Sequence, residues 1–243
     1  MNYETKVRSL VKALSWRTLA TMTTGVLVYI FTGELAIAIT IGSLEVLAKM
    51  VLYFLHERLW QKIKFGRKEI PSFVIWFTGL PSSGKGEIAD RIFTIIQDRK
   101  LRVERINSRC VRPLFPETGF APGEVDQHIR RSGHLCAMLE KNGVVVVASF
   151  VSPYLKSREF ARDQATNFVE VYLKSEPENC SARDEDGLYA RAKSGDLSFF
   201  PGVDVDYEES GAPEIVLDID NISIDEAVAT VDDYLTKNLI TVN

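Results

Sequence analysis

The sequence predicts an α/β domain with a mostly parallel sheet, preceded by an all-α transmembrane helical hairpin. Three observations lead to this fold class. Two hydrophobic runs near the N-terminus are flanked by basic residues. A glycine-rich loop then joins a buried-strand pattern to a helical one, and apolar runs alternate with amphipathic stretches through the rest of the chain. We therefore predict two domains, a membrane hairpin over residues 1–68 and an α/β domain over residues 69–243.

Charge is distributed unevenly between these two parts. Residues 1–68 carry 10 Lys and Arg against 4 Asp and Glu, whereas residues 69–243 carry 19 against 29. A nucleic-acid-binding domain would cluster positive charge, so the acidic larger part excludes nucleic acid as a partner. The basic N-terminal part is attracted to anionic lipid instead. The three cysteines lack the spacing of a disulfide framework or a zinc site, which favours reduced thiols in the cytosol.

The two hydrophobic runs predict the hairpin. Thr18–Gly33 carries no charge, and Leu35–Leu55 is interrupted only by Glu45 and Lys49. Each run, with its flanks, approaches the ~20 residues that a helix needs to cross a bilayer. Lys and Arg flank the outer ends and are absent from the Gly-Glu turn between the runs, so both ends are expected in the cytoplasm. We predict a multi-pass protein of the cytoplasmic (inner) membrane, in contact with membrane lipid, with its larger domain in the cytoplasm.

Glu45 and Lys49 are four residues apart and share one helix face, so they can pair with each other. One interpretation is a self-satisfied pair that fixes the orientation of the helix. The other is an ion path or an interface within a homo-oligomer, because charges inside membranes usually face protein or a wet cavity. A soluble hydrophobic hairpin is a further alternative.

Three short stretches of this region resemble a small bacterial membrane domain of unknown function, DUF2061. They are Lys12-Ala-Leu-Ser-Trp-Arg17, Gly42-Ser-Leu-Glu45 with Lys49, and His56-Glu-Arg-Leu-Trp60. The resemblance covers most of residues 5–66 and implies a membrane location, but no chemistry.

The glycine-rich loop Gly79-Leu-Pro-Ser-Ser-Gly84-Lys85 follows the apolar run Ser72–Phe77 and precedes a helical pattern of isoleucines. This context predicts a P-loop and hence a P-loop NTPase fold. Backbone N–H groups of such a loop converge on phosphate oxygens, and the lysine and the helix N-terminus add positive charge. The predicted nucleotide-binding residues are Gly79, Leu80, Pro81, Ser82, Ser83, Gly84, Lys85 and Gly86, with ATP as the ligand.

Beyond the loop, four apolar runs suit buried strands: Val103–Ile106, Val144–Phe150, Phe168–Leu173 and Glu214–Ile219. Amphipathic stretches occupy the intervals Val125–Lys141, Tyr154–Gln164, Glu176–Ala182 and Ile224–Leu239. Such alternation predicts an open parallel sheet with helices on both faces. Ligands then bind beyond the carboxyl ends of the strands, which is where the P-loop lies.

Longer motifs of residues 72–237 resemble the adenylylsulfate kinase family. The motifs are Phe77-Thr-Gly-Leu-Pro-Ser-Ser-Gly-Lys85, Gly119-Phe120 with Ile129-Arg-Arg131, Ala148-Ser-Phe-Val-Ser-Pro-Tyr154, Cys180-Ser-Ala-Arg-Asp184 with Gly187-Leu-Tyr189, and Phe200-Pro-Gly-Val-Asp204. The resemblance implies transfer of the γ-phosphoryl group of ATP to the 3′-hydroxyl of adenosine 5′-phosphosulfate, with Mg²⁺, beneath a mobile lid near Gly187–Glu208. It also implies nucleotide binding by Arg183 and substrate binding by Arg112, Arg130, Phe150, Val151, Ser152 and Phe200.

Several positions depart from the family's pattern. Gly86 replaces the Ser or Thr whose hydroxyl binds Mg²⁺, and Asn107-Ser-Arg109 replaces an Asp-Gly-Asp that positions metal and acceptor. Val125 replaces a substrate-binding arginine, and Asp186 replaces a lid lysine. The predicted catalytic positions are therefore Lys85, Asn107 and Arg109, the last two in degenerate form, and no metal ligand is assigned.

Three functions remain open at this point. The first is an adenylylsulfate kinase with altered metal handling, and the second is a kinase for a different nucleotide acceptor. The third is a catalytically impaired nucleotide or sulfonucleotide sensor that reports to its membrane module. Loss of positioning groups weighs heavily in phosphoryl transfer, so impaired turnover is expected. His128, which replaces a family asparagine, could act as a base, although a lone helical histidine is more often structural.

Overall fold

The computed structural model describes residues 6–62 and 70–240. The chain divides into two compact units between Arg67 and Lys68. The predicted boundary after residue 68 lies outside the described residues, and each unit is considered by itself.

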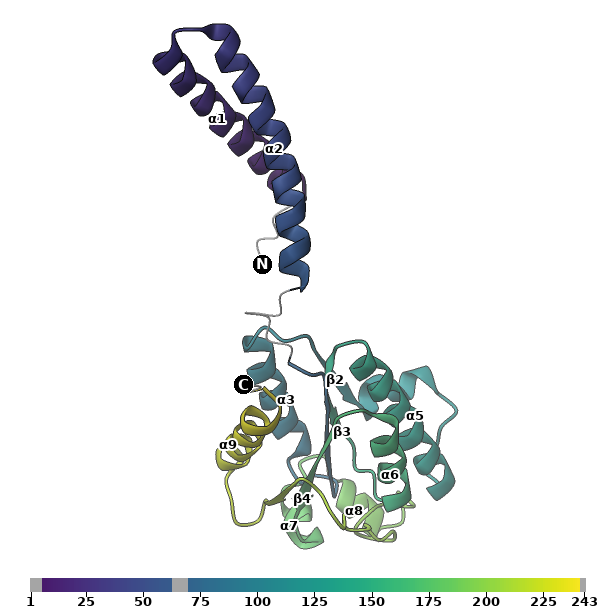
Figure 1. Cartoon of the computed structure of the whole chain (residues 1–243). Coiled ribbons are helices and arrows are strands. Elements are labelled where there is room, and N and C mark those ends of the chain that lie inside the picture. Colours follow the sequence, from purple (N-terminus) through teal and green to yellow (C-terminus); the bar gives the residue numbers. More distant parts are fainter. Residues whose placement is uncertain (1–5, 63–69, 241–243) are drawn as a thin grey trace. The chain divides into compact units, whose positions relative to one another are not determined.

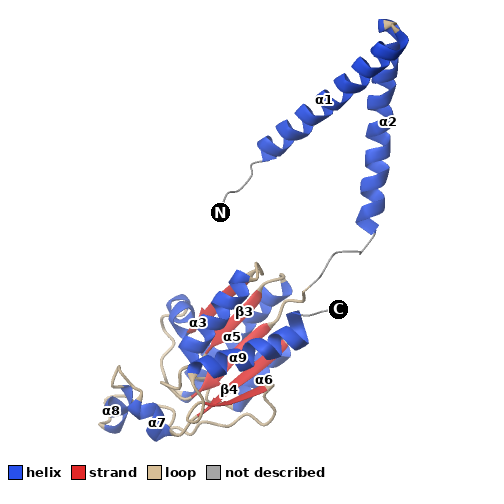
Figure 2. Ribbon diagram, turned by 90° about the vertical axis from the view of Figure 1, so that its left-hand side faces the viewer, coloured by secondary structure: helices blue, strands red, loops and turns tan. Residues whose placement is uncertain are grey.

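The N-terminal unit is a pair of helices, α1 (Lys6–Thr32) and α2 (Leu35–Lys62), that contact each other along a helical hairpin (Figures 1 and 2). Gly33 ends α1 with a positive φ of 73°, a conformation that glycine adopts without strain. Glu45 pairs with Lys49 on α2 and also accepts a hydrogen bond of 3.2 Å from the Thr24 hydroxyl of α1. The charged pair is thus tied to the neighbouring helix.

One apolar stretch of this unit is long enough to cross a membrane. It runs from Leu35 to Leu55 in α2, whereas the apolar stretch of α1, Ala20–Thr32, is shorter. Of the two spans that the sequence predicts, therefore, one meets the length requirement within the described residues. The apolar stretch of α1 is shorter because the first half of this helix contains four basic residues, Lys6, Arg8, Lys12 and Arg17.

The second unit contains a five-stranded sheet whose strands are all parallel. The strands are β1 (Val74–Gly79), β2 (Val103–Asn107), β3 (Val145–Ser149), β4 (Phe168–Lys174) and β5 (Ile215–Asp218), in the order β2-β3-β1-β4-β5. This arrangement confirms the predicted α/β fold with a parallel sheet. The central strand β1 is buried along its whole length, as expected for a strand covered on both faces.

Helices cover both faces of the sheet (Figure 1). Alternate residues of the β1 region face α3 (Lys85–Asp98) and α9 (Ile224–Leu235) on one side. The others, including Trp76, face α5 (Pro122–Lys141) and α6 (Leu155–Gln164) on the other side. The remaining helices are short: α4 (Ser108–Val111), α7 (Pro177–Ala182), α8 (Leu188–Lys193), a 3₁₀ turn (Arg112–Leu114) and a π turn (Thr236–Ile240).

The predicted lid segment, residues 187–208, contains α8 and an irregular loop, and it is docked over the P-loop. The Tyr189 hydroxyl donates to the Pro81 carbonyl oxygen over 3.1 Å. Its ring meets Phe200 edge to face, with ring centroids 5.0 Å apart. The Tyr207 hydroxyl lies 2.7 Å from the hydroxyl of Thr78 on β1. These contacts join the segment to the central strand and close one side of the space beyond the sheet.

A buried ion pair supports the same region from below. Arg158 on α6 and Glu170 on β4 are almost fully buried and lie 3.2 Å apart. Arg158 also donates to the carbonyl oxygens of Ser152 and Glu208. One guanidinium therefore connects α6, β4, the segment after β3 and the end of the lid segment.

Candidate functional site

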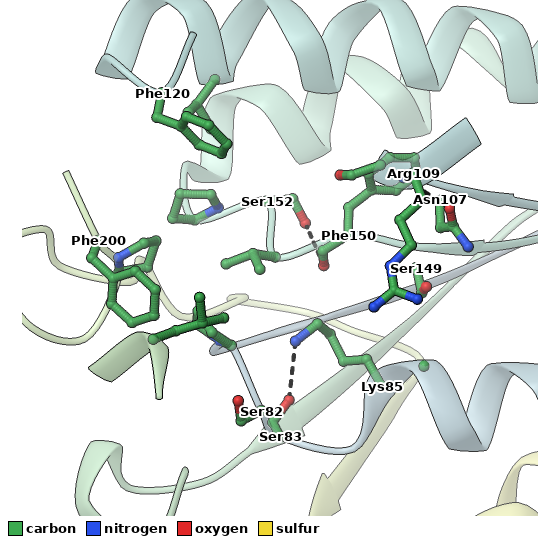
Figure 3. A pocket seen from close by; sticks show the side chains of 18 of the residues that line it. Ser82, Ser83, Lys85, Asn107, Arg109, Phe120, Ser149, Phe150, Ser152 and Phe200 are labelled. Carbon is green, nitrogen blue, oxygen red and sulfur yellow. Dashed lines mark hydrogen bonds between the residues drawn. The ribbon is translucent and has the colours of Figure 1, made fainter. Parts of the chain in front are cut away.

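A cavity of about 1530 Å³ opens beyond the carboxyl ends of β1, β2 and β3 (Figure 3). Its walls are the P-loop and the start of α3, the segment after β2, the N-terminal half of α5, the segment after β3, and the lid segment. Most of the predicted site residues lie in these walls: Pro81, Ser82, Ser83, Gly84, Lys85, Gly86, Asn107, Arg109, Arg112, Phe150, Val151, Ser152 and Phe200.

The P-loop conformation requires glycine at two positions. Gly79 has a φ of 148°, and a Cβ there would lie 2.6 Å from the Leu173 carbonyl oxygen of β4. Gly84, at φ 85°, immediately precedes α3. The loop therefore turns tightly from β1 into the helix, and the N-terminus of α3 faces the cavity. Free N–H groups and the helix dipole make this position suitable for an anion.

Lys85, the first residue of α3, is buried, with 8% of its surface exposed. Its ammonium group donates to the Leu80 carbonyl oxygen and to the Ser83 hydroxyl, the latter over 3.2 Å. No carboxylate pairs with it in the described part of the chain. Burial lowers the pKa of Lys85 from its usual value of 10.5 to about 8. A bound phosphate would provide the missing negative charge.

We expect the affinity for ATP to fall as the pH rises above about 8, because Lys85 loses its proton there in the free protein. Bound phosphate raises the pKa of this lysine, so binding above pH 8 must take up a proton. Below pH 8 the ammonium is already formed, and the contribution is complete. Calorimetric titrations at pH 7 to 9, in buffers of different ionisation enthalpy, would measure the uptake. Lys85→Met should bind more weakly and take up no proton; an unchanged uptake would contradict this assignment.

Asn107 is the last residue of β2, and Arg109 lies in the helix α4 that follows. Their side chains have different roles. The Asn107 side-chain oxygen accepts hydrogen bonds from the backbone N–H groups of Arg109 and Cys110, over 2.9 and 3.2 Å, and so caps α4. That oxygen is committed to the backbone. The Arg109 guanidinium has no hydrogen-bond or ion-pair partner among the described residues. Figure 3 shows Arg109 and Lys85 extending into the same part of the cavity.

The donor groups around the cavity do not fit Mg²⁺. Gly86 offers no hydroxyl, Asn107 uses its oxygen as a cap, and Arg109 brings a positive charge. Carboxylates do line the cavity, but those of the first turns of α3 are paired with arginines: Glu87 with Arg91, and Asp90 with Arg105. Within the described residues, no group of three or more His, Cys, Asp or Glu side chains could hold a metal ion. Mg²⁺ favours carboxylate and hydroxyl oxygens, and the side chains at Gly86, Asn107 and Arg109 offer neither.

The predicted substrate residues in the wall come from the segments after β2 and β3 and from the lid segment. The Arg112 guanidinium donates to the carbonyl oxygens of Thr118 and Gly119 and stacks on the Phe120 ring, 3.9 Å from its centroid. Phe150 stacks on Trp76 with ring centroids 4.7 Å apart. Figure 3 shows Phe120 and Phe200 on the far side from Arg109. This half of the cavity therefore combines aromatic faces with a held arginine.

Two predicted arginines lie outside the cavity wall. Arg130 pairs with Asp126 over 2.9 Å and stacks on the Phe160 ring of α6. Arg183, at the end of α7, donates to the Ile219 carbonyl oxygen and pairs with Asp220. Arg130 is thus engaged by a residue one helical turn away and by a ring of α6, and Arg183 by a distant segment of the chain. Motif position alone does not show these partners. Gly79 and Leu80 also lie behind the wall, as the base of the P-loop.

Several wall residues were not among the predicted site residues, Ser149, Arg105 and Ser108 among them. Ser149 ends β3 and accepts a hydrogen bond of 2.7 Å from Arg105 of β2. Ser108 lies 3.1 Å from Nε2 of His128, a histidine that the sequence left between a basic and a structural role. The signal that could have found Ser149 is its place at the carboxyl end of β3. Arg105 lies in the middle of β2 and reaches the site only through its side chain.

His128 is nearly fully buried, and its Nδ1 has no hydrogen-bond partner in the described structure. Burial, with the positive charges of Arg112 and Arg131, lowers the pKa of His128 to about 4. The imidazole is therefore neutral at physiological pH. It can accept a proton only weakly, which favours the structural role over general-base catalysis.

Comparison with known proteins follows the same division of the chain. Residues 71–218 match the family model for adenylylsulphate kinase. Residues 10–61 match the DUF2061 family, described as a predicted membrane protein. A probable adenylyl-sulfate kinase of Pseudomonas aeruginosa is 35% identical over 164 residues, covering 67% of this chain and 77% of the relative. One from Aeropyrum pernix is 37% identical over 161 residues, covering 64% and 88%.

Among solved structures, the APS kinase of Mycobacterium tuberculosis in complex with AMPPNP and APS superposes with a TM-score of 0.64. It is 28% identical, and the match covers 69% of this chain and 99% of that one. The parallel sheet, the glycine-rich phosphate loop and the extent of these matches agree, and the chain belongs to the adenylylsulphate kinase family.

Proposed function

We propose that this protein binds ATP and adenosine 5′-phosphosulfate as a membrane-anchored phosphotransferase of the adenylylsulfate kinase type, with strongly reduced turnover. The observation that carries the proposal is the buried, carboxylate-free Lys85 at the N-terminus of α3, facing a cavity large enough for two nucleotides. The kinase of Mycobacterium tuberculosis that shares this fold was solved with a nucleotide and APS together.

We assign the triphosphate to the P-loop half of the cavity. Backbone N–H groups of residues 82–86 would hold the phosphate oxygens, and Lys85 would move from the Leu80 carbonyl oxygen to the β- and γ-phosphates. This exchange removes a buried, uncompensated charge and so favours binding.

We assign the acceptor nucleotide to the other half. The Phe120 ring, which is 63% exposed in the cavity wall, offers an apolar surface for a base, whereas Phe150 is buried against Trp76. Arg112, held by two backbone carbonyl oxygens, presents fixed positive charge to a phosphosulfate group. The lid contacts of Tyr189 would exclude water from both ligands.

Reduced turnover follows from the groups between the two halves. Asn107 and Arg109 stand where a pair of carboxylates would position the acceptor hydroxyl and a metal ion. An amide whose oxygen caps a helix cannot take a proton, and a guanidinium cannot act as a base. The same observation favours a second candidate, a sensor that binds these nucleotides without turnover and reports to its membrane module; a kinase for a different acceptor would also tolerate these substitutions.

Binding and turnover can be measured separately on the full chain in mild detergent. Calorimetry should detect binding of ATP and, in its presence, of adenosine 5′-phosphosulfate. A coupled assay of ATP consumption, with and without adenosine 5′-phosphosulfate, then reports turnover. Binding with slow, acceptor-dependent consumption supports the kinase; binding with none supports the sensor. Absence of binding for both nucleotides would refute the proposal as a whole.

We also propose that the α1–α2 hairpin anchors the protein in the cytoplasmic membrane, with both ends on the cytoplasmic side. The apolar stretch Leu35–Leu55, the match to a family described as membrane proteins, and the basic flanks support this. Exposed apolar side chains along both helices, including Phe31 and Leu47, would contact lipid.

The topology can be tested with a reporter fused after Lys68 in the full hairpin. A reporter of cytoplasmic location should be active, and an exported reporter should be silent, because Lys and Arg flank the outer ends of both helices. Reversing this pattern would show a single crossing by α2. Recovery of the full chain with soluble protein after carbonate washing would count against membrane anchoring.

A further inference from the structure

Six cationic side chains line the cavity, and three of them are arginines whose guanidinium groups are held by carboxylates or carbonyl oxygens. Arg91 pairs with Glu87 and Asp225, and Arg105 pairs with Asp90. Arg112 is held by two carbonyl oxygens. The remaining three are Lys85, Arg109 and, on the lid helix α8, Arg191. In the part of the chain that the structure describes, none of these three has a carboxylate within ion-pair distance.

The sheet brings Arg109 and Lys85 to the same place. Arg109 follows β2 and Lys85 follows β1, and β3 lies between these two strands. The register pairs Asn107 with Ser149 and Ser149 with Phe77, so the three strands reach the cavity side by side. Figure 3 shows the Arg109 and Lys85 side chains near each other and near Ser149, the last residue of β3.

The backbone at Arg109 is held in place by hydrogen bonds. The Asn107 side chain caps α4 by accepting from the Arg109 and Cys110 N–H groups, and the Cys110 thiol lies 3.1 Å from the Asn107 nitrogen. The backbone that carries the guanidinium is therefore held, while its head group is exposed and free to meet a ligand.

We propose that this cavity binds the triphosphate of ATP without a divalent cation, with the Arg109 guanidinium providing the charge that Mg²⁺ would otherwise supply. The proposal rests on the proposed nucleotide site. A guanidinium forms two parallel hydrogen bonds with phosphate oxygens and carries a permanent charge. It would repel a divalent cation at the same position, and the oxygens that such a cation requires are missing at Gly86 and Asn107.

The test is the affinity of the full chain in detergent for ATP, measured by calorimetry in excess EDTA and again in excess MgCl₂. Wild-type affinity should be the same within about twofold. Arg109→Ala should lose about tenfold or more in EDTA, since hydrogen bonds to charged groups carry that weight. Arg109→Lys should retain much of the affinity, and Arg109→Asp should make binding depend on Mg²⁺. Arg102→Ala, which removes an exposed arginine at the opposite end of β2, should match the wild type.

The outcomes separate this inference from the function on which it rests. Wild-type affinity that falls tenfold or more in EDTA would overturn metal-free binding and leave the nucleotide site intact. Failure to bind ATP under both conditions would refute the nucleotide site itself. Loss of affinity in Arg109→Ala with an unchanged unfolding midpoint supports a direct phosphate contact. An equal loss in Arg102→Ala would show a general charge effect and overturn the role of Arg109.

Discussion

Combining Gly86→Ser, Asn107→Asp and Arg109→Asp should raise the rate of adenosine 5′-phosphosulfate phosphorylation by about 10²–10⁴-fold, the range over which a positioned acid–base group acts. The triple variant would place a hydroxyl and two carboxylates where, under the proposed function, the acceptor hydroxyl and a metal ion are positioned. The cavity has room for them, since nothing lies within 4 Å of a Cβ built at Gly86. Aspartate caps a helix as well as asparagine does, so α4 should survive the change at residue 107.

The single variants are the controls for this experiment. Groups that act as a unit are not additive, so each single reversion should change the rate little. The coupled assay of ATP consumption is run on the wild type, the three single variants and the triple variant. Calorimetry confirms that each of them binds ATP. Wild-type turnover within the ~1–100 s⁻¹ of ordinary kinases would contradict the impairment. A triple variant that binds ATP and stays silent would favour the sensor or a different acceptor.

Arg158→Met should lower the free energy of unfolding by about 3 kcal/mol, the lower end of the cost of breaking a buried pair, because the buried carboxylate of Glu170 keeps only the partly exposed Arg162 as a cation. Arg158 is 1% exposed and Glu170 is 5% exposed, so neither charge is solvated. The variant also removes the donors to the carbonyl oxygens of Ser152 and Glu208. Urea unfolding of the full chain in detergent, followed by tryptophan fluorescence, would measure the loss; Trp76 lies in the core of this domain.

Arg130→Met provides a matched comparison. Its pair with Asp126 spans one helical turn and is partly exposed, so the expected cost is at most about 1 kcal/mol. Adding Glu170→Gln to Arg158→Met should recover part of the stability, because it removes a buried carboxylate charge that Arg162 alone would then balance. Equal losses for Arg158→Met and Arg130→Met would show that the buried pair contributes no more than a surface pair.

Features that depend on neighbours along the chain could be predicted from the sequence. The glycines at 79 and 84 predict positive φ angles, which are strained for other residues, and the observed φ angles agree. Runs of β-branched residues predicted strands, and the apolar period of 3.6 predicted α3, α5 and α9. Because a P-loop must join a strand to a helix, its place at the edge of a parallel sheet followed as well.

The helix of the predicted lid was harder to predict from the sequence. Residues 187–208 carry no regular period of apolar side chains, and Gly187, with a φ of 68°, immediately precedes α8. Its position depends on Tyr189, which reaches the Pro81 carbonyl oxygen across more than a hundred residues. A short helix held by such a distant contact leaves little trace in its own sequence.

By itself, then, the sequence determined the parallel α/β scaffold, the phosphate loop with Lys85, and the substitutions at residues 86, 107 and 109, since each is a local property of the chain. Only the tertiary structure decided which arginines line the cavity. Arg130 is engaged by Asp126 and Phe160, and Arg183 by Asp220, whereas Arg109 keeps its guanidinium free. It also decided that Lys85 is buried with a lowered pKa. Partner choice and burial depend on segments that folding brings together from distant parts of the sequence, which is why no local pattern encodes them.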